Sequence, residues 1–180
     1  MVETSHILAD QFGFCPTGST TCALVHFIHH ATLMIENNSY VRCLLIDFSK
    51  AFDVVKHAIL LSKLSAFDLL PSIFNWIIAY LTDRAQVSKT PDGQFSIMHP
   101  ITCSIIQGSG IGPTLWLVMA SDLRCISDIN LLFKYDDDTN LLVPKNTDVD
   151  LAVEFGNIPM RADCNGMVTN LHKTKEIVLH

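Results

Sequence analysis

The chain has 180 residues, 49% of them hydrophobic, and a mean hydropathy of +0.32, which excludes a disordered chain and suffices for the core of one domain. The net charge is −6, and 12 lysines and arginines are a weak electrostatic footprint for binding a polyanion. No apolar run reaches the roughly 20 residues of a membrane span, and the N-terminus has no export signal. We therefore expect no membrane contact and an intracellular location, with nucleus and cytoplasm unresolved.

The first half of the chain predicts, in order, a helix over about 19–36, a strand over 41–49, a helix over 54–70 and a helix over 71–84. Ser19 or Thr20 is the candidate cap of the first helix, and Pro71 is a favourable first residue for the last. The run 41–49, VRCLLIDFS, is mainly apolar and ends on polar residues, which is typical of a buried strand. We interpret Asp53 as the cap of the helix that follows it rather than as a metal ligand.

The second half predicts, in order, a β-like segment over 86–106 with a PDG turn, a glycine-rich loop, a helix from Pro113, short strands over 131–135 and 141–143, a helix over 148–164 and a closing strand. The two short strands flank three consecutive aspartates (136–138), so a hairpin with carboxylates at its tip is expected. This order of elements predicts the α+β class, an antiparallel sheet with helices on one face.

Cysteines, histidines and tryptophans invite functional readings that composition and spacing do not support. The six cysteines form no CxxC pair, so we expect reduced and mostly buried thiols. His26, His29 and His30 have a spacing that suits zinc, but with no third ligand nearby in sequence a partly exposed helix face is favoured. Trp76 and Trp116 are interpreted as core residues.

Two acidic points lie at the ends of apolar strands: Asp47, and the pair Asp137 and Asp138. If the two strands are neighbours in one sheet, these carboxylates converge, and such a set holds two Mg²⁺ ions for in-line phosphoryl transfer. Magnesium uses few carboxylates and completes its shell with substrate phosphates, so three aspartates suffice. For the triplet alone, a solvated turn is the favoured interpretation. Asp47 and the glycine-rich loop lie at the right separations from it along the sequence, and this favours the metal site.

Three segments resemble, in order and spacing, the palm motifs of reverse transcriptases from non-LTR (LINE-like) retrotransposons, particularly the jockey and CR1-like groups. They are LLIDFSKAFD (44–53), QGSGIGPTLW (107–116) and KYDDDTNLLVP (134–144). Further segments resemble other signatures of this family: QFGFCPTGSTT (11–21), YLTDRAQV (80–87) and NLHKTKEIV (170–178). The resemblance covers about residues 11–180, and six motifs in the family's order make it specific.

The resemblance implies a partial reverse transcriptase domain over residues 1–180, with the right-hand polymerase palm fold. A fingers remnant is expected over about 1–40 and the palm over about 41–180, with the thumb missing. The implied activity is that of an RNA-directed DNA polymerase, with an RNA template, a DNA primer and dNTPs as partners and two Mg²⁺ ions, or Mn²⁺, as cofactor. The rest of the retrotransposon polyprotein, its thumb and endonuclease, is expected as a partner and is absent from the chain.

The matching motifs also imply metal ligands, position by position. Asp47 corresponds to a ligand of both metals, with the backbone carbonyl of Phe48 as a further ligand. Asp137 and Asp138 match the paired aspartates of the family's Tyr-x-Asp-Asp hairpin.

Other matching positions imply contacts with the nucleotide. Phe52 corresponds to the bulky ring under the sugar of the incoming nucleotide, a gate against the 2′-hydroxyl group. Gln107 and Gly108 match the loop that packs against the nascent base pair and the template. Lys173 corresponds to a lysine that helps to protonate the pyrophosphate leaving group.

Two departures from the family pattern predict weak or absent activity. Asp136 stands where the family has a small or apolar residue, and its charge is expected to repel the primer phosphate, raise a neighbour's pKa or displace a metal. Cys15 stands where relatives carry arginine, so a nucleotide or template contact is lost. The alternative function is a catalytically inert palm remnant that acts as an interaction or nucleic-acid-binding module. A metal-dependent nuclease with the same carboxylates is a third candidate.

Overall fold

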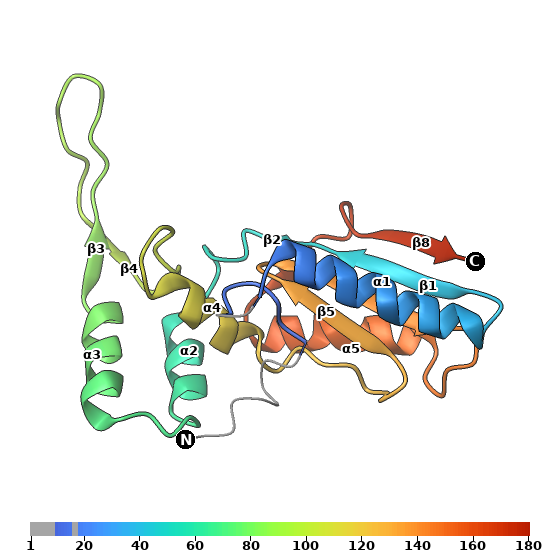
Figure 1. Ribbon diagram of the computed structural model, residues 1–180. Helices are drawn as coiled ribbons and strands as arrows, with labels where there is room; N and C mark the ends of the chain where they lie inside the picture. Colours follow the sequence, from blue (N-terminus) through green and yellow to red (C-terminus); the bar gives the residue numbers. More distant parts are fainter. Residues whose placement is uncertain (1–9, 16–17) are drawn as a thin grey trace.

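The centre of the molecule is a four-stranded antiparallel sheet. The computed structural model describes residues 10–15 and 18–180 (Figure 1). Within them, the strand order is β5–β6–β1–β8, formed by Leu131–Tyr135, Asp138–Pro144, Val41–Ile46 and Lys175–Leu179. Strand β1 is flanked by β6 and β8, both antiparallel to it. The sheet therefore joins three regions that are far apart in the sequence.

Helices cover both faces of this sheet, so the predicted one-sided helix layer is wrong, while the antiparallel sheet is confirmed. Val41 and Cys43 of β1 pack with helix α1 (Thr20–Glu36), whereas Leu44 and Ile46 belong to the larger core that includes α4 (Gly112–Ala120) and α5 (Leu151–Cys164). Figure 1 shows α1 and α5 on opposite sides of the strands. Because successive strand residues point to opposite faces, a strand with buried apolar side chains on both faces requires cover on both.

Helix α1 forms where the sequence predicts it. The Ser19 hydroxyl accepts a hydrogen bond from the Cys22 backbone N–H at 3.0 Å, which confirms Ser19 as the N-cap. At the other end, the side-chain amides of Asn37 and Asn38 donate to carbonyls of the last turn. Cap chemistry therefore determines both ends of this helix.

The predicted strand 41–49 is two strands with Asp47 between them. Strand β1 ends at Ile46, and β2 (Phe48–Ser49) pairs with β7 (Val168–Thr169) in a separate small sheet. The Asp47 carbonyl accepts a hydrogen bond of 2.7 Å from the Asn170 N–H. The chain therefore changes its pairing partner at Asp47, which sequence periodicity does not reveal.

The predicted helix 54–70 is shorter in the structure. Helix α2 spans His57–Leu64, its N-cap position is Lys56, and Asp53 lies in the preceding turn, so the capping role for Asp53 is wrong. The carbonyls of Phe52 and Val55 accept hydrogen bonds of 2.8 Å from a segment about fifty residues later in the chain, at Ile105 and Ser104. These long-range bonds replace the first turn of the expected helix.

The remaining elements agree in type with the prediction. They are α3 (Pro71–Leu81), β3 (Arg84–Gln86), β4 (His99–Ile101), α4, the β5–β6 hairpin, α5 and β8. Strands β3 and β4 carry a long arm that extends away from the body (Figure 1). At its tip the Gly93 N–H donates to the Thr90 carbonyl and Gly93 has a φ of +87°, which confirms the PDG turn.

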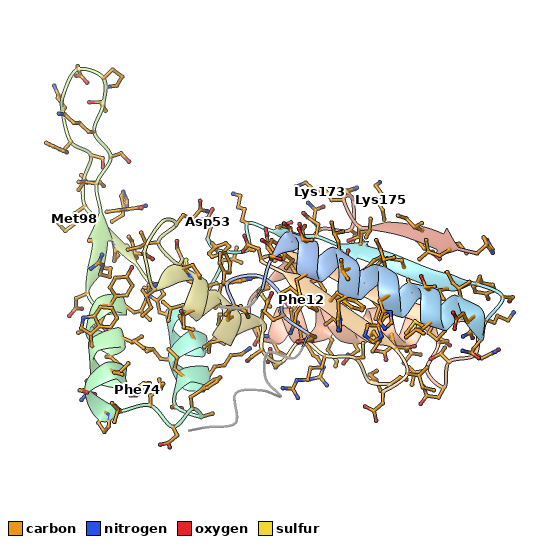
Figure 2. All side chains as sticks on the ribbon, in the orientation of Figure 1. Phe12, Asp53, Phe74, Met98, Lys173 and Lys175 are labelled. Carbon is orange, nitrogen blue, oxygen red and sulfur yellow. The ribbon has the colours of Figure 1, made fainter. Side chains whose placement is uncertain are left out.

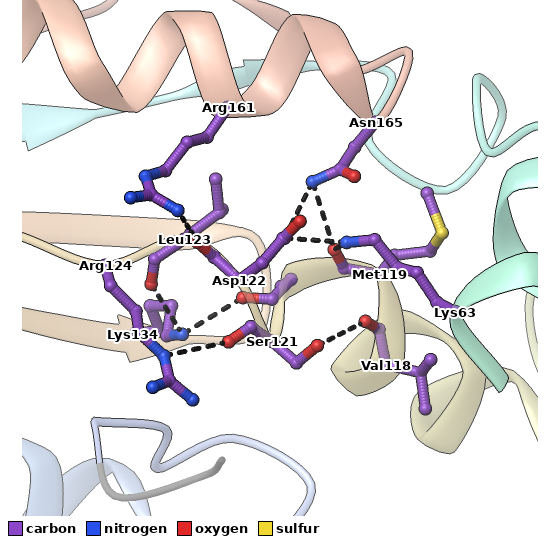
Figure 3. A network of polar contacts seen from close by, with 11 residues as sticks. Lys63, Val118, Met119, Ser121, Asp122, Leu123, Arg124, Lys134, Arg161 and Asn165 are labelled. Atoms are coloured by element: carbon purple, nitrogen blue, oxygen red, sulfur yellow. Dashed lines mark hydrogen bonds and ion pairs between the residues drawn. The ribbon is translucent and has the colours of Figure 1, made fainter. Parts of the chain in front are cut away.

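Two lysines, one of them buried, connect the C-terminal end of α4 to the rest of the body (Figure 3). Lys134 of β5, only 2% exposed, donates to the carbonyls of Ala120 and Leu123 at 3.1 Å and pairs with Asp10 at 3.0 Å. Lys63 of α2 donates to the Met119 carbonyl at 2.6 Å. Cations at the carbonyl end of a helix satisfy orphan acceptors and complement the helix dipole.

Two burial predictions are wrong in part. Trp116 is 1% exposed and belongs to the core as predicted, but Trp76 is 54% exposed. All six cysteines are free as expected, yet among them only Cys43 is buried; three are exposed (Cys22, Cys103 and Cys164) and two are intermediate (Cys15 and Cys125).

None of the described helices combines the length and apolar character that crossing a bilayer requires. The boundary between fingers and palm near residue 40 stays a prediction.

Candidate active site

The register of the central sheet brings two predicted carboxylates together. Ile46 at the end of β1 pairs with Thr139, so Asp47, the next residue, lies beside Asp138 at the start of β6. Burial raises the pKa of Asp138, and the charges of Asp137 and Asp47 add to this effect. Asp47 and Asp138 line a hollow of about 420 Å³ together with Lys173.

Asp47 presents an unsatisfied oxygen in this hollow. Its Oδ2 atom is buried and has no hydrogen-bond partner among the described residues. The Lys173 ammonium lies 3.7 Å from that oxygen, on a side chain that is 69% exposed. Figure 2 labels Lys173 beside the start of β8. A buried carboxylate oxygen without a donor is unfavourable unless a cation neutralises it. The position therefore suits a cation.

The turn of the β5–β6 hairpin holds Asp136 in a left-handed conformation, with a φ of +56°. Its carboxyl oxygen Oδ1 is buried without a hydrogen-bond partner within residues 10–15 and 18–180. Burial raises the pKa of Asp136 to about 6, and the charges of Asp137 and Asp138 contribute in the same direction. Asp136, which departs from the family pattern, is therefore a third acid close to Asp137 and Asp138.

Trp116 links this turn to Phe52. The indole Nε1–H donates to the Asp136 carbonyl at 2.8 Å, and the Trp116 ring stacks on Phe52 with centroids 5.0 Å apart and planes 27° apart. One buried side chain thus positions both the proposed gate ring and the acidic turn. The sequence identified Trp116 only as core; its signal was the indole N–H, because a buried tryptophan usually needs a hydrogen-bond acceptor.

The N-terminal segment supports the hairpin from the outer edge of β5. The Phe12 N–H donates to the Lys134 carbonyl at 2.8 Å, and the Lys134 N–H donates to the Asp10 carbonyl at 2.7 Å. Gly13 lies so close to the turn that an added Cβ would be 2.4 Å from the Asp136 nitrogen. Cys15 makes a local bond from its Sγ to the Gln11 carbonyl, so this position offers no positive charge.

The predicted nucleotide-binding residues are distributed over different surfaces. Gln107 and Gly108 lie in an exposed loop before α4, and Gln107 lines a second cavity of about 860 Å³, separate from the hollow at Asp47. Phe48 is 4% exposed. Because residues 47 and 170 form the hydrogen-bonded pair of their ladder, the Phe48 carbonyl points away from β7.

Divalent metal ions fit the donor chemistry at Asp47 and Asp138 only in part. Within the part of the chain that the structure describes, no three Asp, Glu, His or Cys side chains are placed to hold a metal ion together. Magnesium is often bound by one or two carboxylates plus substrate phosphates, and these two aspartates supply that minimum. The histidines of α1, for which the sequence suggested a zinc spacing, make ring contacts instead: the rings of His26 and His30 lie 4.6 Å apart, and both pack on Phe133.

Curated relatives of this chain are transposon polymerases. It is 32% identical over 139 residues to the RNA-directed DNA polymerase from mobile element jockey of Drosophila melanogaster, covering 73% of this chain and 15% of that protein. It is 32% identical over 154 residues to the probable RNA-directed DNA polymerase from transposon BS of the same organism, covering 81% and 17%. The chain therefore spans about a sixth of the length of these relatives.

Telomerases are among the solved structures that share this fold. The telomerase of Candida tropicalis in complex with a TWJ fragment of telomeric RNA matches with a TM-score of 0.75 and 13% identity, covering 98% of this chain and 31% of that one. An apo form truncated from its C-terminal domain matches with a TM-score of 0.73 and 14% identity, covering 98% and 37%. The palm-like fold class is thus confirmed.

The family model for reverse transcriptase (RNA-dependent DNA polymerase) matches residues 1–178. Members of that family work on an RNA template with a nucleic-acid primer and generally use divalent metal ions. With the fold and the relatives, this match shows that the chain belongs to the family of reverse transcriptases, the RNA-directed DNA polymerases of non-LTR retrotransposons.

Proposed function

We propose that this site is built for RNA-templated DNA synthesis from dNTPs, with two Mg²⁺ ions held by Asp47, Asp137, Asp138 and the Phe48 carbonyl. The observation that carries the proposal is the position of Asp47 beside Asp138, with a buried Asp47 oxygen that has no hydrogen-bond partner among the described residues and has the Lys173 ammonium at 3.7 Å. When bound, the metal ions neutralise charge on the transferring phosphoryl group and polarise the primer 3′-hydroxyl.

In this proposal the protein mainly positions its substrates. Phe52, held by its stack on Trp116, limits the space at the sugar 2′ position. Gln107 and Gly108 pack against the nascent base pair. Lys173 protonates the pyrophosphate; its long, exposed side chain moves readily from Asp47 toward a leaving group. Positioning and electrostatic stabilisation are the main sources of rate enhancement in phosphoryl transfer.

We propose that activity is weak or absent in this chain. Asp136 adds a negative charge at the point where the primer phosphate approaches, and Cys15 supplies no cation. The competing function, an inert palm that serves as a binding module, is favoured by one observation: the described residues contain no group of three side chains suited to a metal ion. We further propose residues 1–40 as a fingers part and 41–180 as the palm, with a thumb and an endonuclease supplied by a longer polyprotein.

Primer extension on an RNA template, with Mg²⁺ or Mn²⁺, tests the proposal. Any extension, however slow, should be abolished by Asp47→Ala and unaffected by Asp68→Ala, which removes an exposed acid outside the hollow at Asp47. Absence of extension with either cation supports the inert palm instead. Cleavage of the labelled template without dNTPs supports a nuclease.

A readout independent of turnover is Mn²⁺ binding followed by electron paramagnetic resonance. Asp138→Asn should weaken binding by roughly tenfold or more, since even residues that only support metal ligands have effects of that size. Lys173→Met should tighten binding, because it removes the ammonium that competes for the Asp47 oxygen. If neither substitution changes Mn²⁺ affinity, the ions bind elsewhere and the assignment of this site is wrong.

A further inference from the structure

Helix α3 and the start of β3 carry a ladder of planar side chains that the proposed chemistry does not use. Trp76 stacks on Tyr80 with ring centroids 5.6 Å apart and planes 19° apart, and the Arg84 guanidinium carbon lies 5.3 Å from the Tyr80 ring centroid. Trp76 and Tyr80 are four residues apart in α3, which places them on the same helix face, and Arg84 is the first residue of β3, just after the helix. Trp76, at the end of the ladder, is 54% exposed. A large aromatic surface is therefore open to solvent.

A cavity of about 860 Å³ begins at this ladder and reaches the loop before α4. Tyr80 and Arg84 line one side, and Ser104 and Gln107 line another. The Tyr80 hydroxyl oxygen is buried and has no hydrogen-bond partner within the described parts of the chain. An unpaired buried hydroxyl is unfavourable, and a ligand oxygen or nitrogen that reaches it removes the penalty.

The chemistry of the cavity suits nucleobases better than phosphates. Its walls carry one acid, Asp53, against the guanidinium of Arg84, so their formal charges balance, and neutral hydrogen-bonding side chains such as Gln86 and Gln107 supply donors and acceptors. Planar bases stack on aromatic rings and on guanidinium planes with little dependence on sequence. The phosphates would then remain on the solvent side. Because the cavity offers few cations to them, salt should have little effect on the binding affinity.

We propose that the ladder Trp76–Tyr80–Arg84 and the cavity beside it bind single-stranded nucleic acid, with successive bases stacked on the ladder. The direction of the strand rests on the proposed function: Gln107, assigned to the nascent base pair, lies at the far side of the same cavity, so the unpaired template passes from that loop to Trp76. Binding itself requires neither metal nor catalysis.

The test uses the two tryptophans of the chain, Trp76 exposed and Trp116 buried. A fluorescein-labelled uridine 12-mer should quench tryptophan emission in the wild-type chain and leave that of Trp76→Phe unchanged, since the remaining Trp116 is enclosed. By fluorescence anisotropy, Trp76→Phe should bind with nearly the wild-type affinity because it keeps a ring. Trp76→Ala should bind roughly tenfold more weakly, as expected for the loss of one stacked base.

Phe95 provides the matched control. It is 68% exposed on the arm, and the Lys89 ammonium lies 5.8 Å from its ring centroid, so it also combines an aromatic ring with a cation but lies outside the cavity. Phe95→Ala should leave binding unchanged. The proposal is overturned if the RNA does not bind, if it binds without quenching, or if Trp76→Ala and Phe95→Ala weaken binding equally. Circular dichroism checks that each variant is folded.

These outcomes separate the ladder from the polymerase. Quenching without primer extension leaves the binding track in place and removes the proposed catalytic function. Primer extension without quenching keeps the proposed catalytic function and removes the binding track, since the template then follows another path.

Discussion

Asp136 combines a negative charge with a backbone conformation that few side chains adopt. Its φ of +56° is accessible to asparagine and aspartate more readily than to alanine. Its carboxyl group is held near two other acids, which raises its pKa together with burial. Asn and Ala substitutions therefore separate charge from backbone strain.

We expect Asp136→Asn to raise the free energy of unfolding by about 1 kcal/mol at pH 8 in EDTA, because it removes a repelled charge and keeps the tolerated conformation. Asp136→Ala removes the same charge but adds about 1 kcal/mol of left-handed strain, so its net effect should be near zero. Urea denaturation measures both. If Asp136→Ala is more stable than Asp136→Asn, the left-handed turn geometry is contradicted. If Asp136→Asn has the wild-type free energy of unfolding, the expected charge repulsion is contradicted.

Trp116→Phe isolates the hydrogen bond to the acidic turn. The substitution keeps a ring for Phe52 but leaves the Asp136 carbonyl without its indole donor, which should cost about 1–2 kcal/mol of unfolding free energy. The same change at exposed Trp76 should lie within about 0.5 kcal/mol of wild type. Equal effects at both positions would show that the bond at Trp116 contributes nothing.

At the scale of elements, Lys134 of β5 binds the carbonyls at the end of α4 (Figure 3), and the same ammonium group pairs with Asp10 of the N-terminal segment. Lys134→Met should destabilise the fold by about 3–5 kcal/mol, because Asp10 and two carbonyls lose a buried partner. Thermal and urea denaturation check the value against Lys175→Met, where an exposed side chain should matter little. A small loss at Lys134 would mean that water or another donor replaces the ammonium.

Strand β8 is held to β1 by a surface ion pair whose contribution depends on pH. The Arg42 guanidinium donates to both Glu176 carboxylate oxygens, and this contact lowers the pKa of Glu176. A lowered carboxyl pKa stabilises the fold above about pH 4.3, the unfolded value, and the gain is lost as pH falls through the folded value.

Glu176→Gln should therefore lower the free energy of unfolding by about 0.5 kcal/mol at pH 7, as is usual for exposed pairs, and have no effect near pH 2. Denaturant titrations at the two pH values measure this difference. A loss that persists at the lower pH would assign it to packing of the side chain instead.

At the scale of the whole molecule, burial sorts the six thiols into two groups. Burial raises the pKa of Cys43 to about 11 and that of Cys125 to about 12, with nearby acids adding to the second. Alkylation at pH 8 should therefore label Cys22, Cys103 and Cys164 quickly in the folded chain, and all six only after unfolding. Mass spectrometry after brief treatment with N-ethylmaleimide identifies the labelled positions. Rapid labelling of Cys43 would show that the sheet opens.

Local signals predicted much of the fold, and long-range pairing explains the errors. Helix α1 has a cap at Ser19, and the acidic hairpin has two apolar runs around a turn, so both were readable. Helix α2 starts late because Val55 pairs with a segment fifty residues away. Helix α3 is apolar around most of its circumference, so sequence alone could not show that Trp76 faces solvent.

The site was predictable in its residues but not in its supports. Asp47 and Asp138 were identified from strand ends, and their meeting depends on a strand order that only the register of β1 with β6 establishes. The indole bond from Trp116 and the ion pair of Lys173 with Asp47 join residues 20 and 126 positions apart. Contacts of that kind follow from tertiary packing, which residue spacing does not encode.

Gly13 allows the N-terminal segment to pack directly against the backbone of the acidic turn. Every other amino acid would place a carbon atom 2.4 Å from the Asp136 nitrogen, a separation that backbone atoms do not tolerate. Selection for a correctly placed turn therefore acts on a residue more than a hundred positions earlier, which takes no part in the chemistry. In a library randomised at codon 13, survivors other than glycine should carry compensating changes in the hairpin, so the pair would drift together across lineages.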